Sequence, residues 1–207
     1  MKHINEIILI TIMLGAGVVY AGKSPEIKLE WENKTEEVSW KTVLDEKGKD
    51  VWIVEQIPET SSDDNFSNLL VVQEFKNQKK TSSEKFAKGL FKLASKDCEG
   101  LRINGPKSNK DNGYEVSYVQ IYCGKRIGTD YGTETFQKVI KIGDLIYVVT
   151  REFRVPPNAT GGVTSFSKDK MEEMMAMMKA KGLASNYLVK DVFVCGGKSK
   201  NEKCPDK

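Results

Sequence analysis

The chain has 207 residues and carries 32 lysine and arginine residues against 29 aspartate and glutamate residues, which gives a net charge of only +3. The two signs are interspersed, and the one basic stretch, Lys76–Lys80, is short, so the strongly one-sided charge typical of nucleic-acid-binding proteins is missing. The single histidine, His3, lies in a segment that we expect to be removed, which excludes histidine-based catalysis and histidine zinc sites from the remaining chain.

Residues 1–21 have the pattern of a secretory signal peptide. Lys2 precedes an apolar run that is too short for a spanning helix of about 20 residues, and Val19 and Ala21 fit the small-residue positions of a cleavage site. We therefore predict a bacterial protein exported to the periplasm or secreted, with no stable membrane span after cleavage. Residues 22–207 would form a single domain with a short polar C-terminal tail. An uncleaved membrane anchor is the alternative.

The first elements along the chain are predicted strands. Ile27–Trp31 alternates apolar and charged residues, as a half-exposed strand does. Val38–Leu44 and Val51–Ile57 follow, joined by a charged turn around Gly48. Leu69–Phe75 is a further strand, rich in branched residues.

A helix is predicted next. Thr81–Glu84 fits the capping box, in which a hydroxyl and a carboxylate each satisfy a free backbone amide. Apolar residues such as Phe86 and Leu90 then recur at helical spacing, which predicts a helix to about Lys96 with Cys98 just beyond its end.

A second group of strands follows this helix. Tyr114–Cys123 alternates cleanly, and Thr135–Ile142 is joined to Leu145–Phe153 by Gly143-Asp144, a two-residue hairpin signal. Pro156-Pro157 ends the last of these strands.

The last helix is predicted over Lys168–Lys181, with Ser167 as its cap and Gly182 as its stop. Its methionines recur at i, i+3, i+4 and i+7, and we expect this stripe to pack on the sheet, with a partner-binding surface as the alternative. The segment Leu188–Val194 is expected to return as a short strand. The stripe consists of Met171, Met174, Met175 and Met178, with Met177 beside it.

Four cysteines, Cys98, Cys123, Cys195 and Cys204, form an even set, which in an oxidising compartment favours disulfides. Three connectivities are possible, and the sequential pairing is preferred because each pair then encloses a compact local unit. Metal binding is the rival interpretation, but the spacings match no common zinc site.

The order of strands, helix, strands, helix indicates an α+β fold: a mainly antiparallel sheet covered by two helices, α/β/α sandwich-like, in a single domain with disulfides. The strand LLVVQEF, the helix SSEKFAKGLFKLA, the strand NGYEVSYVQIYC and the hairpin KVIKIGDLIYVVTREFR, followed by a helix, resemble the PsbP-like family of small exported proteins. This resemblance implies a mostly non-enzymatic accessory or binding domain.

The residues themselves suggest no catalytic, cofactor or metal site. Acidic neighbours are interpreted as solvated surface, because paired carboxylate catalysis requires two groups that face each other across a substrate. These neighbours are Asp63-Asp64, Glu36-Glu37 and Glu172-Glu173. Five tyrosines either line a concave face or, as we prefer, belong to a sheet face covered by a helix. They are Tyr114, Tyr118, Tyr122, Tyr131 and Tyr147.

We predict a non-enzymatic exported protein that binds a protein partner, such as an envelope-assembly factor, an inhibitor or an immunity protein, without cofactors. The alternatives are an enzyme that uses carboxylates or tyrosine, and a carrier of an apolar ligand. The partner is expected on the loop before the last helix, because long loops on a rigid scaffold commonly carry recognition residues. The candidates are Pro157, Asn158, Thr160 and Val163.

Overall fold

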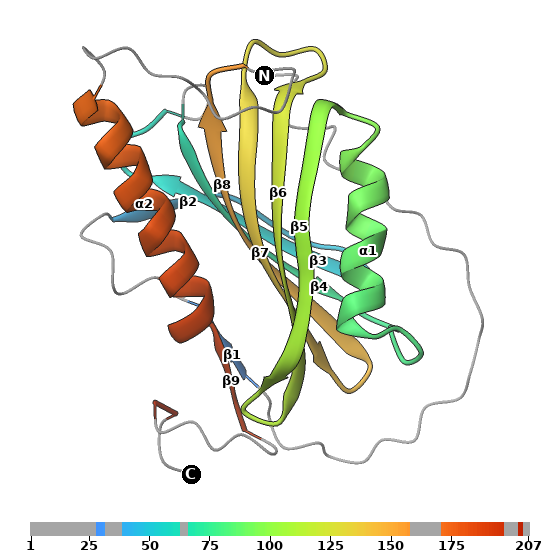
Figure 1. The fold of residues 1–207 in the computed structure, drawn as a ribbon. Coiled ribbons are helices and arrows are strands. Elements are labelled where there is room, and N and C mark those ends of the chain that lie inside the picture. The colour runs from blue at the N-terminus through green and yellow to red at the C-terminus, as the bar shows by residue number, and fades with distance from the viewer. Residues whose placement is uncertain (1–27, 32–38, 63–65, 158–170, 197–202, 205–207) are drawn as a thin grey trace.

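A seven-stranded antiparallel sheet forms the centre of the computed structural model, which describes residues 28–31, 39–62, 66–157, 171–196 and 203–204 (Figure 1). In spatial order its strands are β2 (Trp40–Lys47), β3 (Val51–Pro58), β4 (Asn68–Phe75), β8 (Leu145–Val155), β7 (Gly132–Ile142), β6 (Tyr114–Arg126) and β5 (Cys98–Asp111). The sheet therefore ends in two edge strands, β2 and β5.

A second, two-stranded sheet joins the two ends of the described chain. In it β1 (Lys28–Glu30) pairs antiparallel with β9 (Phe193–Cys195), and Leu29 and Val194 are buried at this contact. The Tyr187 hydroxyl donates a hydrogen bond to the Trp31 carbonyl, which ties the residue after β1 to the last helix.

The two helices pack against opposite faces of the large sheet. Successive strand residues point to opposite faces, so branched residues on the central strands form a core under each helix. A third, smaller cluster consists of Ile57, Leu69 and Val71. Helix α1 (Ser83–Ala94) lies over β5, β6 and β7, whereas α2 (Met171–Lys190) lies over β7 and β8 (Figure 1). The α1 core includes Ala87, Val119, Val139, Ile146 and Val148. The α2 core includes Val72, Val116, Ile140, Val149, Tyr187 and Leu188.

The mainly antiparallel sheet with two helices and two disulfides agrees with the predicted fold class. The strands contribute more of the fold than an α/β/α sandwich implies, because each helix covers only part of its face. The predicted hairpin turn at Gly143-Asp144 is confirmed, with Ile142 paired to Leu145 and Gly143 at a φ of 55°. In the described residues, no helix combines the length and apolarity needed to cross a membrane.

Helix α1 begins one residue later than the predicted capping box implies. Ser82, rather than Thr81, is the N-cap, and its hydroxyl accepts a hydrogen bond from the Lys85 amide at 3.1 Å. The helix ends at Ala94, and Cys98 opens β5, a strand that the sequence did not predict.

The predicted end of the last helix at Gly182 is wrong. Helix α2 continues through this glycine to Lys190, and Ala184, Tyr187 and Leu188 of the continuation are buried. Most of the predicted strand at 188–194 is therefore helical, and only its end forms β9. The predicted cap, Ser167, lies outside the described residues.

The prediction that the methionine stripe packs on the sheet is also wrong for its described members. The exposed fraction is 63% for Met175 and 65% for Met178, while Met177 is partly buried. Instead, the side of the helix that carries Ala184, Tyr187 and Leu188 faces the core. The side chains of Met171 and Met174 lie outside the described set.

Both disulfides have the sequential pairing. Cys98–Cys123 joins β5 to β6 and Cys195–Cys204 holds the segment after β9, each with a Cα–Cα distance of 5.5 Å. The described cysteines therefore leave no free thiol.

The two disulfides predict unequal contributions to stability. The longer loop of Cys98–Cys123 restricts the unfolded chain more, so its removal by paired Cys→Ala changes should lower the free energy of unfolding by about 3.5 kcal/mol, against about 2.7 kcal/mol for Cys195–Cys204. Denaturant unfolding of both double variants measures the difference. A larger loss for the Cys195–Cys204 pair would contradict the ranking.

Candidate functional site

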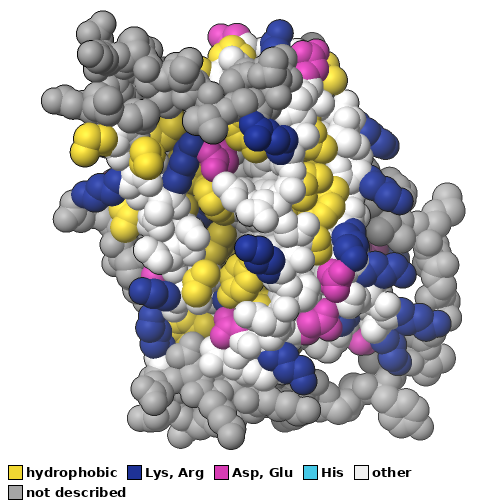
Figure 2. Space-filling view, viewed as in Figure 1, with side chains coloured by type: hydrophobic (Ala, Val, Ile, Leu, Met, Phe, Trp, Pro, Cys, Tyr) yellow, Lys and Arg dark blue, Asp and Glu magenta, His cyan; other side chains and the backbone are white. Residues whose placement is uncertain are grey.

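A groove lies where α2 leaves part of the sheet uncovered. Because α2 packs on β7 and β8, the same face of β6 and β5 extends beyond the helix. The groove has a volume of about 200 Å³, and Figure 2 shows hydrophobic side chains gathered along the boundary between α2 and the neighbouring strands. Its lining includes Asn104 and Lys107 from β5, Tyr118 from β6, Phe136 from β7, and Ser185 and Val189 from α2.

Two aromatic rings form the floor of this groove. Phe136 is packed edge-on against Phe153 of β8, with ring centroids 6.2 Å apart. The Lys138 ammonium lies over the ring of Tyr118, with its Nζ 5.4 Å from the ring centroid. Burial, with the nearby Asp111 carboxylate, raises the pKa of Tyr118 to about 12, so its hydroxyl is neutral at ordinary pH.

Lys138 anchors the floor to the end of α2. Its side chain is fully buried, and its Nζ contacts the Asp111 Oδ2 at 2.6 Å and the Val192 carbonyl, just after the helix, at 2.7 Å. Burial lowers the pKa of Lys138, while the hydrogen bond and charge of Asp111 oppose this shift. One buried ammonium thus connects β7, the β5 end and the α2–β9 junction.

A second polar contact holds the middle of α2. Glu134 on β7 forms an ion pair with Lys181 of α2 and accepts a hydrogen bond at 2.8 Å from the Gln120 Nε2 of β6. The helix is therefore fixed to the sheet at Lys181 and again at its C-terminal end. These attachments hold the groove open in a defined shape.

The side of α2 that borders the groove carries exposed apolar residues. Met178 and Val189 are 65% and 52% exposed, and Val189 lines the groove together with Ser185 and Leu188. Among the described residues that line the groove, the only charged side chain is that of Lys107. The groove is therefore an aromatic and aliphatic surface with amide donors and one cation at its edge.

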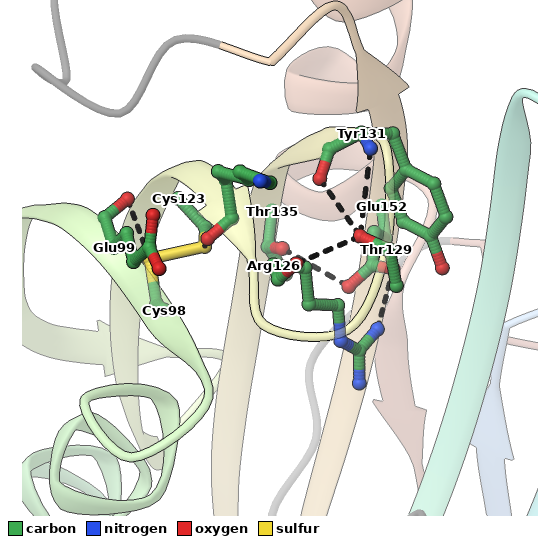
Figure 3. Close-up of a disulfide and its surroundings, with 9 residues drawn as sticks. Cys98, Glu99, Cys123, Arg126, Thr129, Tyr131, Thr135 and Glu152 are labelled. Carbon is green, nitrogen blue, oxygen red and sulfur yellow. Dashed lines mark hydrogen bonds and ion pairs between the residues drawn. A yellow bond between two sulfur atoms is a disulfide. The ribbon is translucent and has the colours of Figure 1, made fainter.

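The opposite face of the sheet holds a cluster of acidic and hydroxyl side chains. Glu152 on β8 accepts a hydrogen bond from Thr135 at 3.2 Å, and its other oxygen lies 3.7 Å from the Arg126 guanidinium (Figure 3). Glu55 on β3 is only 4% exposed, and its Oε1 has no hydrogen-bond partner among the described residues. Burial, followed by the charges of Glu152 and Glu46, raises the pKa of Glu55, while Arg126 opposes the shift.

The predicted partner-binding loop is mostly outside the described residues. Pro157 is exposed just after β8, but Asn158, Thr160 and Val163 lie in the undescribed segment. The acidic neighbours at 36–37 and 63–64 lie outside the described residues, and those at 172–173 lie in α2 without described side chains.

The tyrosines divide between the two interpretations. Tyr114, Tyr118 and Tyr147 all contribute to the helix-covered core, and Tyr118 also lines the groove. Tyr122 lies beyond it under Arg102, and Tyr131 stacks against Arg154 in the β6–β7 region. The residues of α2 that border the groove were missed, because the helix was predicted to stop at Gly182.

Two solved structures illustrate what this chain is similar to. No family model matches the chain, and no curated protein matches it. A solved protein of unknown function from Pseudomonas aeruginosa is 12% identical, with a TM-score of 0.39 over 65% of this chain and 81% of its own. LpqN, involved in cell envelope biogenesis of Mycobacterium tuberculosis, is also 12% identical, with a TM-score of 0.39 over 82% of this chain and 91% of its own.

The Lys138 anchor can be tested by Lys138→Met, which keeps the apolar stem and removes the charge. The Asp111 carboxylate and the Val192 carbonyl would then lose their buried partner, so we expect the free energy of unfolding to fall by about 3 kcal/mol. Lys88→Met is the matched control, because the Lys88–Glu84 pair is exposed and should change stability by less than about 0.5 kcal/mol. Equal effects in denaturant unfolding would refute the anchoring role.

The raised pKa of Glu55 predicts a pH-dependent stability difference. The folded protein holds this proton more tightly than the unfolded chain, so the contribution of Glu55 is complete at low pH and is lost as the pH rises from about 4.5 through its folded pKa. Glu55→Gln stays neutral, so its stability relative to the wild type should increase over that range. Thermal unfolding of both proteins from pH 4 to 8 measures this difference, and a difference independent of pH would contradict it.

Proposed function

We propose that this protein is an exported, non-enzymatic binding domain that holds a protein partner in the groove between α2 and β5–β7. The observation that carries the proposal is the exposed apolar side of α2 at the border of that groove. Interaction sites commonly combine a groove with exposed apolar side chains at its border. Here Met178 and Val189 are exposed on a helix whose opposite side already fills a core.

The size of the groove favours a protein partner over a carried apolar molecule. Pockets for ligands of drug size commonly enclose about 300–1,000 Å³ and bury most of the ligand. The groove holds about 200 Å³ and is open to solvent, which suits side chains inserted from a larger surface. A protein partner could bury the groove and the exposed side of α2 together.

Export is supported by the covalent structure together with the predicted signal peptide. Two disulfides are typical of proteins that fold in oxidising compartments. A periplasmic or secreted location would also place the groove among envelope or extracellular proteins, in keeping with an accessory role in assembly or inhibition.

An enzyme based on carboxylates is the second candidate, and Glu55 with Glu152 is the observation that favours it. A buried carboxyl group whose pKa is raised, as that of Glu55 is, can serve as a general acid. Glu55 is nevertheless only 4% exposed, so a substrate could not reach its carboxyl group without displacing the residues that cover it. This burial favours a structural role for Glu55.

Site-specific photo-crosslinking tests the proposed function. A photoreactive amino acid replaces Ser185 in the groove or, as a control, Ile127, which is 57% exposed in the β6–β7 loop. After irradiation in cells that produce the protein, we expect a protein adduct of discrete mass from position 185 only. Lipid adducts at position 185, equal adducts at both positions, or a turnover that Glu152→Gln abolishes would overturn the proposal.

A further inference from the structure

The exposed side of α2 has the spacing of a helix-pairing seam. Met175, Met178, Gly182, Ser185 and Val189 follow one another at intervals of three and four residues, the spacing at which two α-helices pack along a shared line. Ser185 and Val189 of this line border the groove, so the line continues the groove along the helix. We call these five residues the α2 seam.

The centre of the α2 seam is built for close approach. A Cβ atom placed on Gly182 would meet nothing within 4 Å apart from the adjoining residues and backbone of its own helix, so the space beside this glycine is open. The small residues Gly182 and Ser185 lie between the larger Met178 and Val189, an arrangement that lets a second backbone come near while its side chains fill the gaps. The seam runs over 15 residues, from Met175 to Val189, or about 21 Å of helix.

The charges around the seam indicate the charge of the partner. Lys179 flanks it on α2 and Lys107 flanks the groove on β5; both are exposed, and neither has an ion-pair partner among the described residues. The neighbouring carboxylate of Glu134 is already engaged by Lys181 and Gln120. Self-association through this surface would place cationic side chains of both copies at one interface, which disfavours it.

We propose, building on the proposed function, that the groove and the α2 seam receive an acidic amphipathic helix of a partner protein. Its apolar side would lie along the seam and insert side chains over Tyr118 and Phe136, since a helix of about 10–12 Å diameter cannot enter a groove of this volume whole. Its flanking carboxylates would face Lys107 and Lys179. The mode is that of a helix bound in an apolar groove.

The test uses fluorescent 21-residue helical peptides with leucine at the seam-facing positions. One peptide carries glutamate at the flanking positions, a second carries lysine there, and a third keeps glutamate but has serine in place of leucine. In fluorescence anisotropy with the full protein, we expect the acidic leucine peptide to bind at least tenfold more tightly than either other peptide. Equal binding of the acidic and basic peptides, or no binding at all, would overturn the proposal.

Variants of the protein locate the contact. Gly182→Gln places a side chain in the open space and removes a helix-weakening glycine, so the melting temperature should hold or rise while affinity falls at least tenfold. Ile127→Glu, the matched control, should leave affinity unchanged, and joint Lys107→Glu and Lys179→Glu changes should reverse the preference between acidic and basic peptides. Unchanged affinity in Gly182→Gln would refute the seam as the binding surface.

The two proposals fail separately. If no peptide binds but position 185 still crosslinks a partner protein, the helix proposal falls and the proposed function stands. If the crosslink is absent, the proposed function falls. A dimer detected by sedimentation and abolished by Gly182→Gln would replace the acidic helix with a second copy of this chain as the occupant.

Discussion

A wide sheet with apolar residues on both faces must be covered on both sides, and this constraint governs the described fold. One helix packs on each face, and neither reaches across all seven strands. Helix α1 covers the β5–β7 side of one face, and α2 covers β7 and β8 on the other. The groove exists because β5 and β6 continue past α2. The groove therefore depends on how far α2 extends across the sheet as well as on the residues that line it.

Two buried cations, Arg151 and Lys138, lie between the sheet and the elements that pack on it. Arg151 is fully buried among the rings of Trp40, Phe153 and Tyr187, with its Cζ 4.5, 5.8 and 5.6 Å from their centroids. These rings come from β2, β8 and α2, so a single guanidinium links an edge strand to the helix. Guanidinium groups stack on aromatic faces at a smaller desolvation cost than an ammonium group, which suits this position. Lys138 has a comparable role a few residues further along the chain, where its Nζ contacts the Val192 carbonyl just after α2.

Much of the fold followed from local patterns, and the failures have identifiable causes. The strong alternation of β6 and the turn at Gly143-Asp144 were sufficient to predict their elements. Strand β5 was missed because an edge strand with many exposed residues lacks apolar alternation. The sequence does contain a hairpin signal for β5, because Asn112-Gly113 forms the turn between β5 and β6 with both residues at positive φ.

The groove was predictable only in part, because the sequence pattern suggested that the last helix ends at Gly182, before the α2 residues that line the groove. A glycine within a helix costs about 1 kcal/mol relative to alanine, which made Gly182 a plausible end. Burial of Ala184, Tyr187 and Leu188 outweighs that cost and carries the helix onward. The spacing of the methionines showed that they share one side, but spacing alone cannot say whether that side faces the sheet or the solvent.

The pairing of β1 with β9 has a mechanical consequence. Lys28 is opposite Cys195, so the chain before β1 and the chain after β9 leave this small ladder at the same end. A force that draws the two ends apart therefore loads its three residue pairs one after another, as in opening a zipper, and not all at once. The Cys195–Cys204 disulfide does not bridge the two strands. Under tension the terminal ladder would separate first, while the large sheet and its helices keep their arrangement.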